Sequence, residues 1–177
     1  REPGKAICRQ VLDDLSPQEI SDDGRWLLGD FLDVQQRSKR ALWDLNAEDP
    51  ASTRREVVGA DFGFSASFSS NSHYLVTSSG QDLTRIMALP PGQSDKQEEL
   101  KGHGATTAGV RISPESNWIA TAAEDDMIRL THWKSKKLRS LQGFDRDSYR
   151  DIFSLSFSQD SRWLIASANA NIYVWDL

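Results

Sequence analysis

Hydrophobic and polar residues alternate along short runs of the chain. GVRIS at 109–113, IRLTHW at 128–133 and IYVWDL at 172–177 each place apolar side chains at alternate positions. Successive side chains of a β-strand point to opposite faces of a sheet, so this alternation predicts strands. Ser, Asp, Asn, Gly and Pro gather between the runs, as in SDDG and SPES, and predict tight turns. The pattern therefore predicts an all-β protein.

The same pattern occurs four times along the chain. The copies share an apolar residue, a Ser, turn-forming residues, an aromatic residue and two apolar or small residues: ISDDGRWLL (20–28), FSSNSHYLV (68–76), ISPESNWIA (112–120) and FSQDSRWLI (157–165). The shared Ser recurs at intervals of 48, 44 and 45 residues. A second anchor recurs every 44 residues, at Trp43, Met87, Thr131 and Trp175. Two anchors with one spacing predict four repeats, each of about four short strands.

A period of about 40 to 45 residues is typical of the blades of β-propellers. The sequence resembles WD40 repeats in LKGH followed by ISPESNWIATAAEDDMIRL (100–103, 112–130), in SFSQDSRWLIAS with VWDL, and in SDDGRWLL with LWDL. The resemblance implies a β-propeller of WD40 type with about four blades of four-stranded antiparallel sheets, either a partial propeller or half of a larger ring. WDLNAEDPAS at 43–52 is also similar to blade linkers of large bacterial multidomain signalling proteins.

The repeats predict the organisation of the chain. The expected segments are an outer strand of a preceding or the last blade (1–12), three blades (13–58, 59–102 and 103–143), and a fourth blade that lacks its outer strand (144–177). GKAICRQVL at 4–12 either completes the fourth blade or belongs to a preceding one. The chain is accordingly expected to be a fragment of a longer polypeptide, half of a dimeric eight-bladed ring, or a tight four-bladed ring. Open blade faces would allow self-association.

The resemblance also implies a buried hydrogen-bond network in each blade. Its members are a His near the blade start, a Ser or Thr in the second strand, an Asp in the next turn and a Trp in the third strand. The third repeat has His103, Thr121 and Asp125 at matching positions, with Thr131 in the Trp position and Trp133 on the same strand face. The first and fourth repeats have Trp-Asp pairs, which are Trp43 with Asp44 and Trp175 with Asp176.

Two groups of residues have an alternative interpretation. His103 and Asp125 could form a catalytic or metal-binding pair, although no third ligand or nucleophile recurs with them. The four equivalent aromatic residues are expected to pack at the start of each second strand, and the alternative is an aromatic ring that lines a ligand surface; they are Trp26, Tyr74, Trp118 and Trp163.

Composition and charge narrow the classes of partner. The net charge is −5, from 26 acidic and 21 basic residues without a run of five like charges, which disfavours a nucleic-acid or anionic-membrane surface. Cys8 is the only cysteine, so an intrachain disulfide is excluded and a reducing, cytoplasmic location is expected. The first ten residues lack the apolar core of a signal peptide.

The sequence contains none of the common catalytic motifs. GxSxG, GxxxxGK[ST], HExxH, CxxC and GxGxxG do not occur, so no enzymatic activity, cofactor or metal is expected. The predicted function is a non-catalytic scaffold for protein or peptide partners. The alternative is the sensor or regulatory propeller of a multidomain signalling enzyme, a kinase or an NTPase. The loop DRDSYRD at 145–151 supplies the predicted partner contacts Arg146, Tyr149 and Arg150, because Arg and Tyr are frequent interface hot spots.

Overall fold

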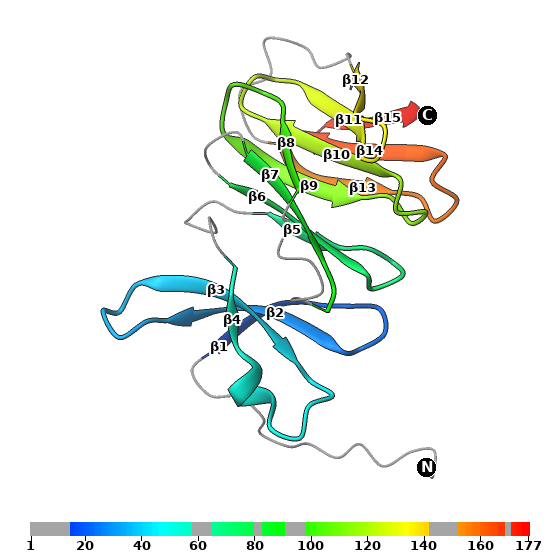
Figure 1. Ribbon diagram of the computed structural model, residues 1–177. Helices are drawn as coiled ribbons and strands as arrows, with labels where there is room; N and C mark the ends of the chain where they lie inside the picture. The colour runs from blue at the N-terminus through cyan, green and yellow to red at the C-terminus, as the bar shows by residue number, and fades with distance from the viewer. Residues whose placement is uncertain (1–14, 58–64, 80–82, 91–97, 142–151, 169–170) are drawn as a thin grey trace.

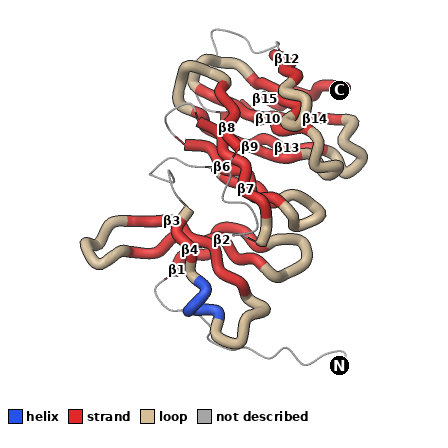
Figure 2. Tube along the Cα trace, in the orientation of Figure 1, coloured by secondary structure: helices blue, strands red, loops and turns tan. Residues whose placement is uncertain are grey.

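A computed structural model describes residues 15–57, 65–79, 83–90, 98–141, 152–168 and 171–177. Over these ranges the chain forms short antiparallel strands and one turn of 3-10 helix, η1 (Pro50–Thr53) (Figures 1 and 2). The strands are arranged in four separate sheets. The prediction of an all-β architecture is confirmed, and none of the four described sheets closes on itself.

Each sheet is a meander in which consecutive strands are hydrogen-bonded neighbours. The first sheet holds β1 (Leu15–Ile20), β2 (Trp26–Leu32), β3 (Ser38–Asp44) and β4 (Arg55–Glu56). The second holds β5 (Ala66–Phe68), β6 (Tyr74–Ser79), β7 (Leu83–Ala88) and β8 (Glu98–Lys101). The third holds β9 (Thr107–Ile112), β10 (Trp118–Ala123), β11 (Ile128–His132) and β12 (Lys137–Leu141). The fourth holds β13 (Ile152–Phe157), β14 (Trp163–Ala168) and β15 (Asn171–Asp176).

The turn between the first two strands has the same structure in all four sheets. The Ser at its start accepts a hydrogen bond through Oγ from the amide of the aromatic residue five positions later, at 2.9–3.0 Å; the pairs are Ser21–Trp26, Ser69–Tyr74, Ser113–Trp118 and Ser158–Trp163. The residue three positions after the Ser has a positive φ of 55–70°; it is Gly24, Ser72, Ser116 or Ser161. Gly24 adopts this conformation without steric cost because it lacks a Cβ atom, whereas the three serines adopt it with one. Each aromatic residue is the first residue of its strand.

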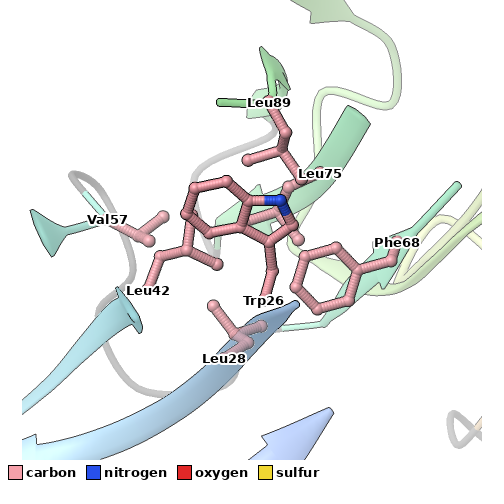
Figure 3. Close-up of a cluster of buried hydrophobic side chains, with 7 residues drawn as sticks. All are labelled: Trp26, Leu28, Leu42, Val57, Phe68, Leu75 and Leu89. Atoms are coloured by element: carbon pink, nitrogen blue, oxygen red, sulfur yellow. The ribbon is translucent and has the colours of Figure 1, made fainter. Parts of the chain in front are cut away.

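The sheets pack face to face in chain order, and the first sheet lies at the bottom of Figure 1. The first interface surrounds Trp26, which lies between Leu28, Leu42 and Val57 of its own sheet and Phe68, Leu75 and Leu89 of the second (Figure 3). The second interface joins Val76, Ile86 and Leu100 to Val110, Ile112, Ile119 and Trp133. The third joins Ala120, Ala122, Ile128 and Leu130 to Leu155, Leu164 and Ala166. Successive residues of β6 and β10 therefore contact opposite neighbours: one side chain packs on the preceding sheet and the next packs on the following sheet.

Two predicted features of the organisation fall partly outside the described residues. The expected strand at 1–12 lies there entirely, so its pairing with the fourth sheet stays a prediction. The predicted blade boundaries also stay a prediction. Within the described ranges, no helix is long and apolar enough to cross a bilayer.

Candidate functional site

The structure brings His103, Thr121 and Asp125 together at the interface between the second and third sheets. His103 follows β8, Thr121 lies in β10 and Asp125 lies in the turn that leads to β11. The imidazole Nδ1 is 2.9 and 3.0 Å from the two carboxylate oxygens of Asp125, and Nε2 is 2.8 Å from Oγ1 of Thr121. A carboxylate can only accept, so Nδ1 donates to Asp125.

Arg129 is the fourth polar member of this cluster. Its Nη2 lies 3.4 Å from Oδ2 of Asp125, and its guanidinium also borders Gly102. Thr131 lines the same small space as Thr121 and His103. Trp133 contributes elsewhere, because its Nε1 donates to the carbonyl of Ser116 at 2.8 Å and its ring meets Tyr74 edge to face at a centroid distance of 5.1 Å.

The position of His103 determines what this cluster can do. Only 2% of its side-chain surface is exposed, and both ring nitrogens are engaged. An enclosed imidazole with satisfied nitrogens holds neighbouring segments together because breaking its bonds would leave buried polar groups without partners. Among the described residues, no group of three or more His, Cys, Asp or Glu side chains is arranged to hold a metal ion. The turn at residues 124–126 has the sequence EDD. The carboxylate of its middle residue, Asp125, contacts His103 and Arg129.

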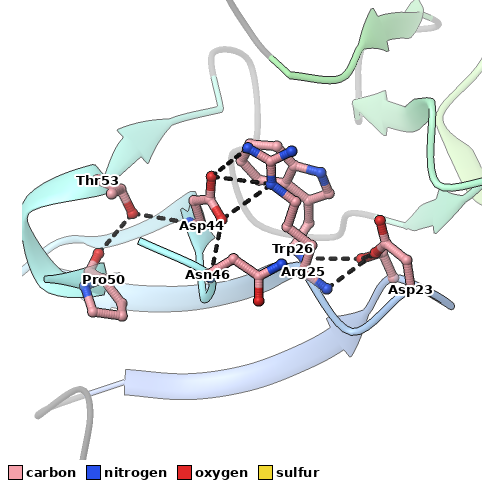
Figure 4. A network of polar contacts seen from close by, with 8 residues as sticks. Asp23, Arg25, Trp26, Asp44, Asn46, Pro50 and Thr53 are labelled. Atoms are coloured by element: carbon pink, nitrogen blue, oxygen red, sulfur yellow. Dashed lines mark hydrogen bonds and ion pairs between the residues drawn. The ribbon is translucent and has the colours of Figure 1, made fainter. Parts of the chain in front are cut away.

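The structure does not bring the two Trp-Asp pairs to the His103 cluster; each lies in its own sheet. Trp43 is buried and meets Phe31 edge to face at a centroid distance of 6.2 Å. Asp44 receives a bidentate interaction from Arg25, whose Nη2 is 2.7 Å from Oδ2 and whose Nε is 3.1–3.2 Å from both oxygens (Figure 4). The Arg25 guanidinium also lies 4.7 Å above the ring of Trp26.

The fourth sheet repeats this arrangement with equivalent residues. Arg162 contacts Asp176 through Nε and Nη2 at 3.1 and 3.0 Å, and its guanidinium lies 4.9 Å from the ring of Trp163. Trp175 stacks on Tyr173 at a centroid distance of 6.1 Å. Sequence analysis missed the two arginines, although a signal was present: both repeats that carry Trp-Asp also carry Arg directly before the aromatic residue, as GRW and SRW.

The arginines change the acidity of their partners. Hydrogen bonds from Arg25 lower the pKa of Asp44 below its ordinary value of 3.8, and Arg162 does the same for Asp176. In the adjacent turns, hydrogen bonds from Ser21 and Ser158 lower the pKa of Asp23 and Asp160. These carboxylates are therefore ionised at neutral pH and act as acceptors, so their chemistry is that of structural ion pairs.

Two lysines that flank the turn between β11 and β12 also have partners. Lys136 forms an ion pair with Glu98 of the second sheet at 2.5 Å, and Lys134 lies 5.4 Å from the ring of Trp133. The predicted contact residues Arg146, Tyr149 and Arg150 lie outside the described residues, so their role stays a prediction.

Exposed apolar side chains on the fourth sheet form the most distinctive surface of the described residues. Ile165 of β14 is 39% exposed, and Ile172 and Val174 of β15 are 73% and 54% exposed. Their side chains lie on the face of the sheet opposite to Leu155 and Leu164, which contact the third sheet. We call Ile165, Ile172 and Val174 the open face. Ile165 lies directly opposite Val174 in the strand register, and exposed apolar side chains that lie together are typical of interfaces.

Comparison with known proteins identifies the repeats. The family model "WD domain, G-beta repeat" matches residues 94–132 and 135–176. Small ribosomal subunit protein RACK1z of Oryza sativa subsp. japonica is 33% identical over 78 residues, which cover 44% of this chain and 22% of the relative. Guanine nucleotide-binding protein subunit beta-like protein 1 of Mus musculus is 27% identical over 143 residues, which cover 77% of this chain and 40% of the relative.

The chain thus spans less than half the length of these two relatives. The matched segments include the third and fourth sheets, in which the Ser turns, the His103 cluster and the Arg162–Asp176 pair are found. The resemblance inferred from the sequence is confirmed for residues 94–132 and 135–176, which are WD40 repeats.

Proposed function

We propose that the chain is a non-catalytic protein-interaction module that presents the open face of its fourth sheet to a protein partner. The observation that carries this proposal is the exposure of Ile165 and Val174. Equivalent positions in the preceding sheets are 0–3% exposed because another sheet covers them: Leu28, Leu42, Val76, Ile86, Ala120 and Leu130. The open face therefore has the apolar chemistry of a protein interface.

The use of the polar residues supports a role without catalysis. The His103 imidazole is enclosed and engaged at both nitrogens, and Asp44 and Asp176 are engaged by arginines. These groups are engaged in hydrogen bonds and ion pairs that stabilise the repeats, which is a structural role.

The relatives support a role in protein assembly. One is named as a ribosomal subunit protein and the other as resembling a subunit of a guanine nucleotide-binding protein. A chain built from the same repeats is suited to hold other proteins. Should the module be the regulatory part of a signalling enzyme, the open face would contact another part of that enzyme. Its cytoplasmic location stays a prediction.

The experiment compares tagged wild-type chain with the Val174→Lys variant in affinity capture, followed by titration of each purified partner. A lysine at the centre of the open face should weaken binding at least about tenfold, because an apolar contact is replaced by a buried charge. Leu138→Lys is the matched control, because Leu138 is a 50% exposed aliphatic residue in the outer strand β12. Equal binding by Val174→Lys and wild type would contradict the proposal. Turnover in a broad panel of hydrolase substrates would contradict the non-catalytic role.

A further inference from the structure

One nitrogen of the Arg129 guanidinium is buried without a hydrogen-bond partner. Its Nη2 lies 3.4 Å from Oδ2 of Asp125, but among the described residues no group accepts a hydrogen bond from Nε. A buried donor without an acceptor costs free energy, so folded proteins satisfy nearly all such groups with a protein atom or an ordered water molecule. Nε of Arg129 therefore requires an acceptor beside it.

Thr121 has acceptor lone pairs on the same side of the sheet. It is the cross-strand neighbour of Arg129 in the pairing of β10 with β11, so both side chains project from one face. Nδ1 of His103 donates to Asp125, and the second nitrogen of a neutral imidazole is an acceptor. The Thr121 hydroxyl therefore donates its proton to Nε2 of His103 at 2.8 Å and keeps only lone pairs for other contacts.

These groups line one small cavity between the second and third sheets. Its volume is about 10 Å³, which is close to the smallest volume that holds one water molecule. The polar residues of its wall are Thr84, His103, Thr121, Arg129 and Thr131. Thr84, His103 and Thr121 are at most 9% exposed. The cavity therefore combines the size of a single water with the two to four polar partners that a buried water needs.

The small side chain of Thr131 leaves room for this cavity. Thr131 occupies the anchor position that holds Trp43 in the first repeat and Trp175 in the fourth. A threonine side chain is much smaller than an indole. Trp133, the next residue on the same strand face, donates its Nε1 to the carbonyl of Ser116 instead. The third repeat therefore has a small polar space where two other repeats have a ring.

We propose that one ordered water molecule occupies this cavity and completes the His103 network of the third repeat. The water accepts a hydrogen bond from Nε of Arg129 and donates one to Oγ1 of Thr121. Its second proton is donated to the hydroxyl of Thr84 in β7, so the water also links the third sheet to the second. Three hydrogen bonds are the usual number for a buried water. The site is independent of the open face and of the proposed function.

Oxygen-17 magnetic relaxation dispersion tests the proposal in solution, because it counts the water molecules that a folded chain holds for longer than its tumbling time. Wild type should hold one more such water than Thr131→Leu, whose larger aliphatic side chain fills the cavity. It should also hold one more than Arg129→Met, which removes the donor. Arg139→Met is the matched control and should give the wild-type count, because the Arg139 guanidinium lies 5.3 Å from the ring of Trp118 and outside the cavity wall.

Equal counts in wild type, Thr131→Leu and Arg129→Met would overturn the proposal. Circular dichroism would verify that the variants fold, and Thr131→Leu alone decides the test if loss of the contact with Asp125 unfolds Arg129→Met. A high-resolution crystal structure of the wild type needs no variant. It should show electron density within hydrogen-bond distance of Nε of Arg129 and Oγ1 of Thr121. A direct hydrogen bond from Nε to a protein oxygen, or a cavity without density, would contradict the water site.

Discussion

Arg25 and Asp44 form a bidentate ion pair that joins the start of β2 to the end of β3 (Figure 4). The guanidinium lies at the same time above Trp26, the central side chain of the first inter-sheet cluster. The Asp of the Trp-Asp sequence therefore positions an arginine that covers the aromatic residue. Arg162, Asp176 and Trp163 show the same relationship in the fourth sheet.

Asp44→Asn should lower the free energy of unfolding by about 1 kcal/mol, because it removes the charge from a partly buried bidentate pair. Chemical denaturation at neutral pH would measure the change. Asp176→Asn is the matched control: the Asp176 side chain is 54% exposed and that of Asp44 is 17% exposed, so its loss should be smaller. Equal losses at the two sites would contradict a role for burial.

The Arg25–Asp44 pair should also make stability depend on pH. The pKa of Asp44 is lower in the folded chain than its ordinary value of 3.8. The contribution of the pair is therefore fully present above pH 3.8 and is lost as the pH falls through the folded value. Unfolding midpoints of wild type and Asp44→Asn should converge in that acidic range, and a constant difference down to the lowest pH would contradict the assignment.

Glu19 should have the opposite effect. Burial raises its pKa above the ordinary value of 4.5, and its Oε1 accepts a hydrogen bond from the amide of Phe68 across the first interface at 3.4 Å. Ionisation of this carboxyl therefore disfavours the folded state as the pH rises. Glu19→Gln keeps the acceptor oxygen, so it should raise the unfolding temperature at neutral pH and show little difference from wild type below pH 4.5. A lower unfolding temperature at neutral pH would contradict this reasoning.

His103→Gln should lower the free energy of unfolding by about 1–3 kcal/mol, because the hydroxyl of Thr121 and the carboxylate of Asp125 would lose the hydrogen bonds that the imidazole makes with them. A double-mutant cycle with Asp125→Asn should give a coupling energy of at least about 0.5 kcal/mol. His73→Gln is the control, because His73 is exposed and should contribute little to stability. It directly precedes Tyr74 in the second repeat, as Arg25 precedes Trp26 in the first. Additive effects of the His103 and Asp125 substitutions would show that the contact contributes no net stability.

The same chemical change should have different costs at two valines. Val76 is fully buried between the second and third sheets, and Val174 is 54% exposed on the open face. Val76→Ala should cost about 2 kcal/mol through lost burial and a cavity. Val174→Ala in dilute solution should change stability by less than about 0.5 kcal/mol. Denaturant midpoints would distinguish them, and a large loss for Val174→Ala in dilute solution would mean that the open face is covered within a single chain.

Several features were predictable from the sequence because they depend on neighbouring residues. The Ser turn uses a short acceptor side chain, a residue with positive φ and an amide five positions after the Ser, so it is visible at Ser21, Ser69, Ser113 and Ser158. The roles of Arg25 and Arg162 were not recognised, because a guanidinium can reach its carboxylate only after β2 and β3, or β14 and β15, have paired.

The sequence by itself determined the strands, the turns and the period of about 44 residues, because alternation and turn chemistry act over a few positions. Tertiary structure alone decided which apolar residues are covered. Leu28, Val76, Ala120 and Ile165 occupy equivalent positions in the repeat, yet three are fully buried and the fourth is 39% exposed. Burial depends on whether another sheet lies against the face, and this is a property of packing between segments far apart in the chain.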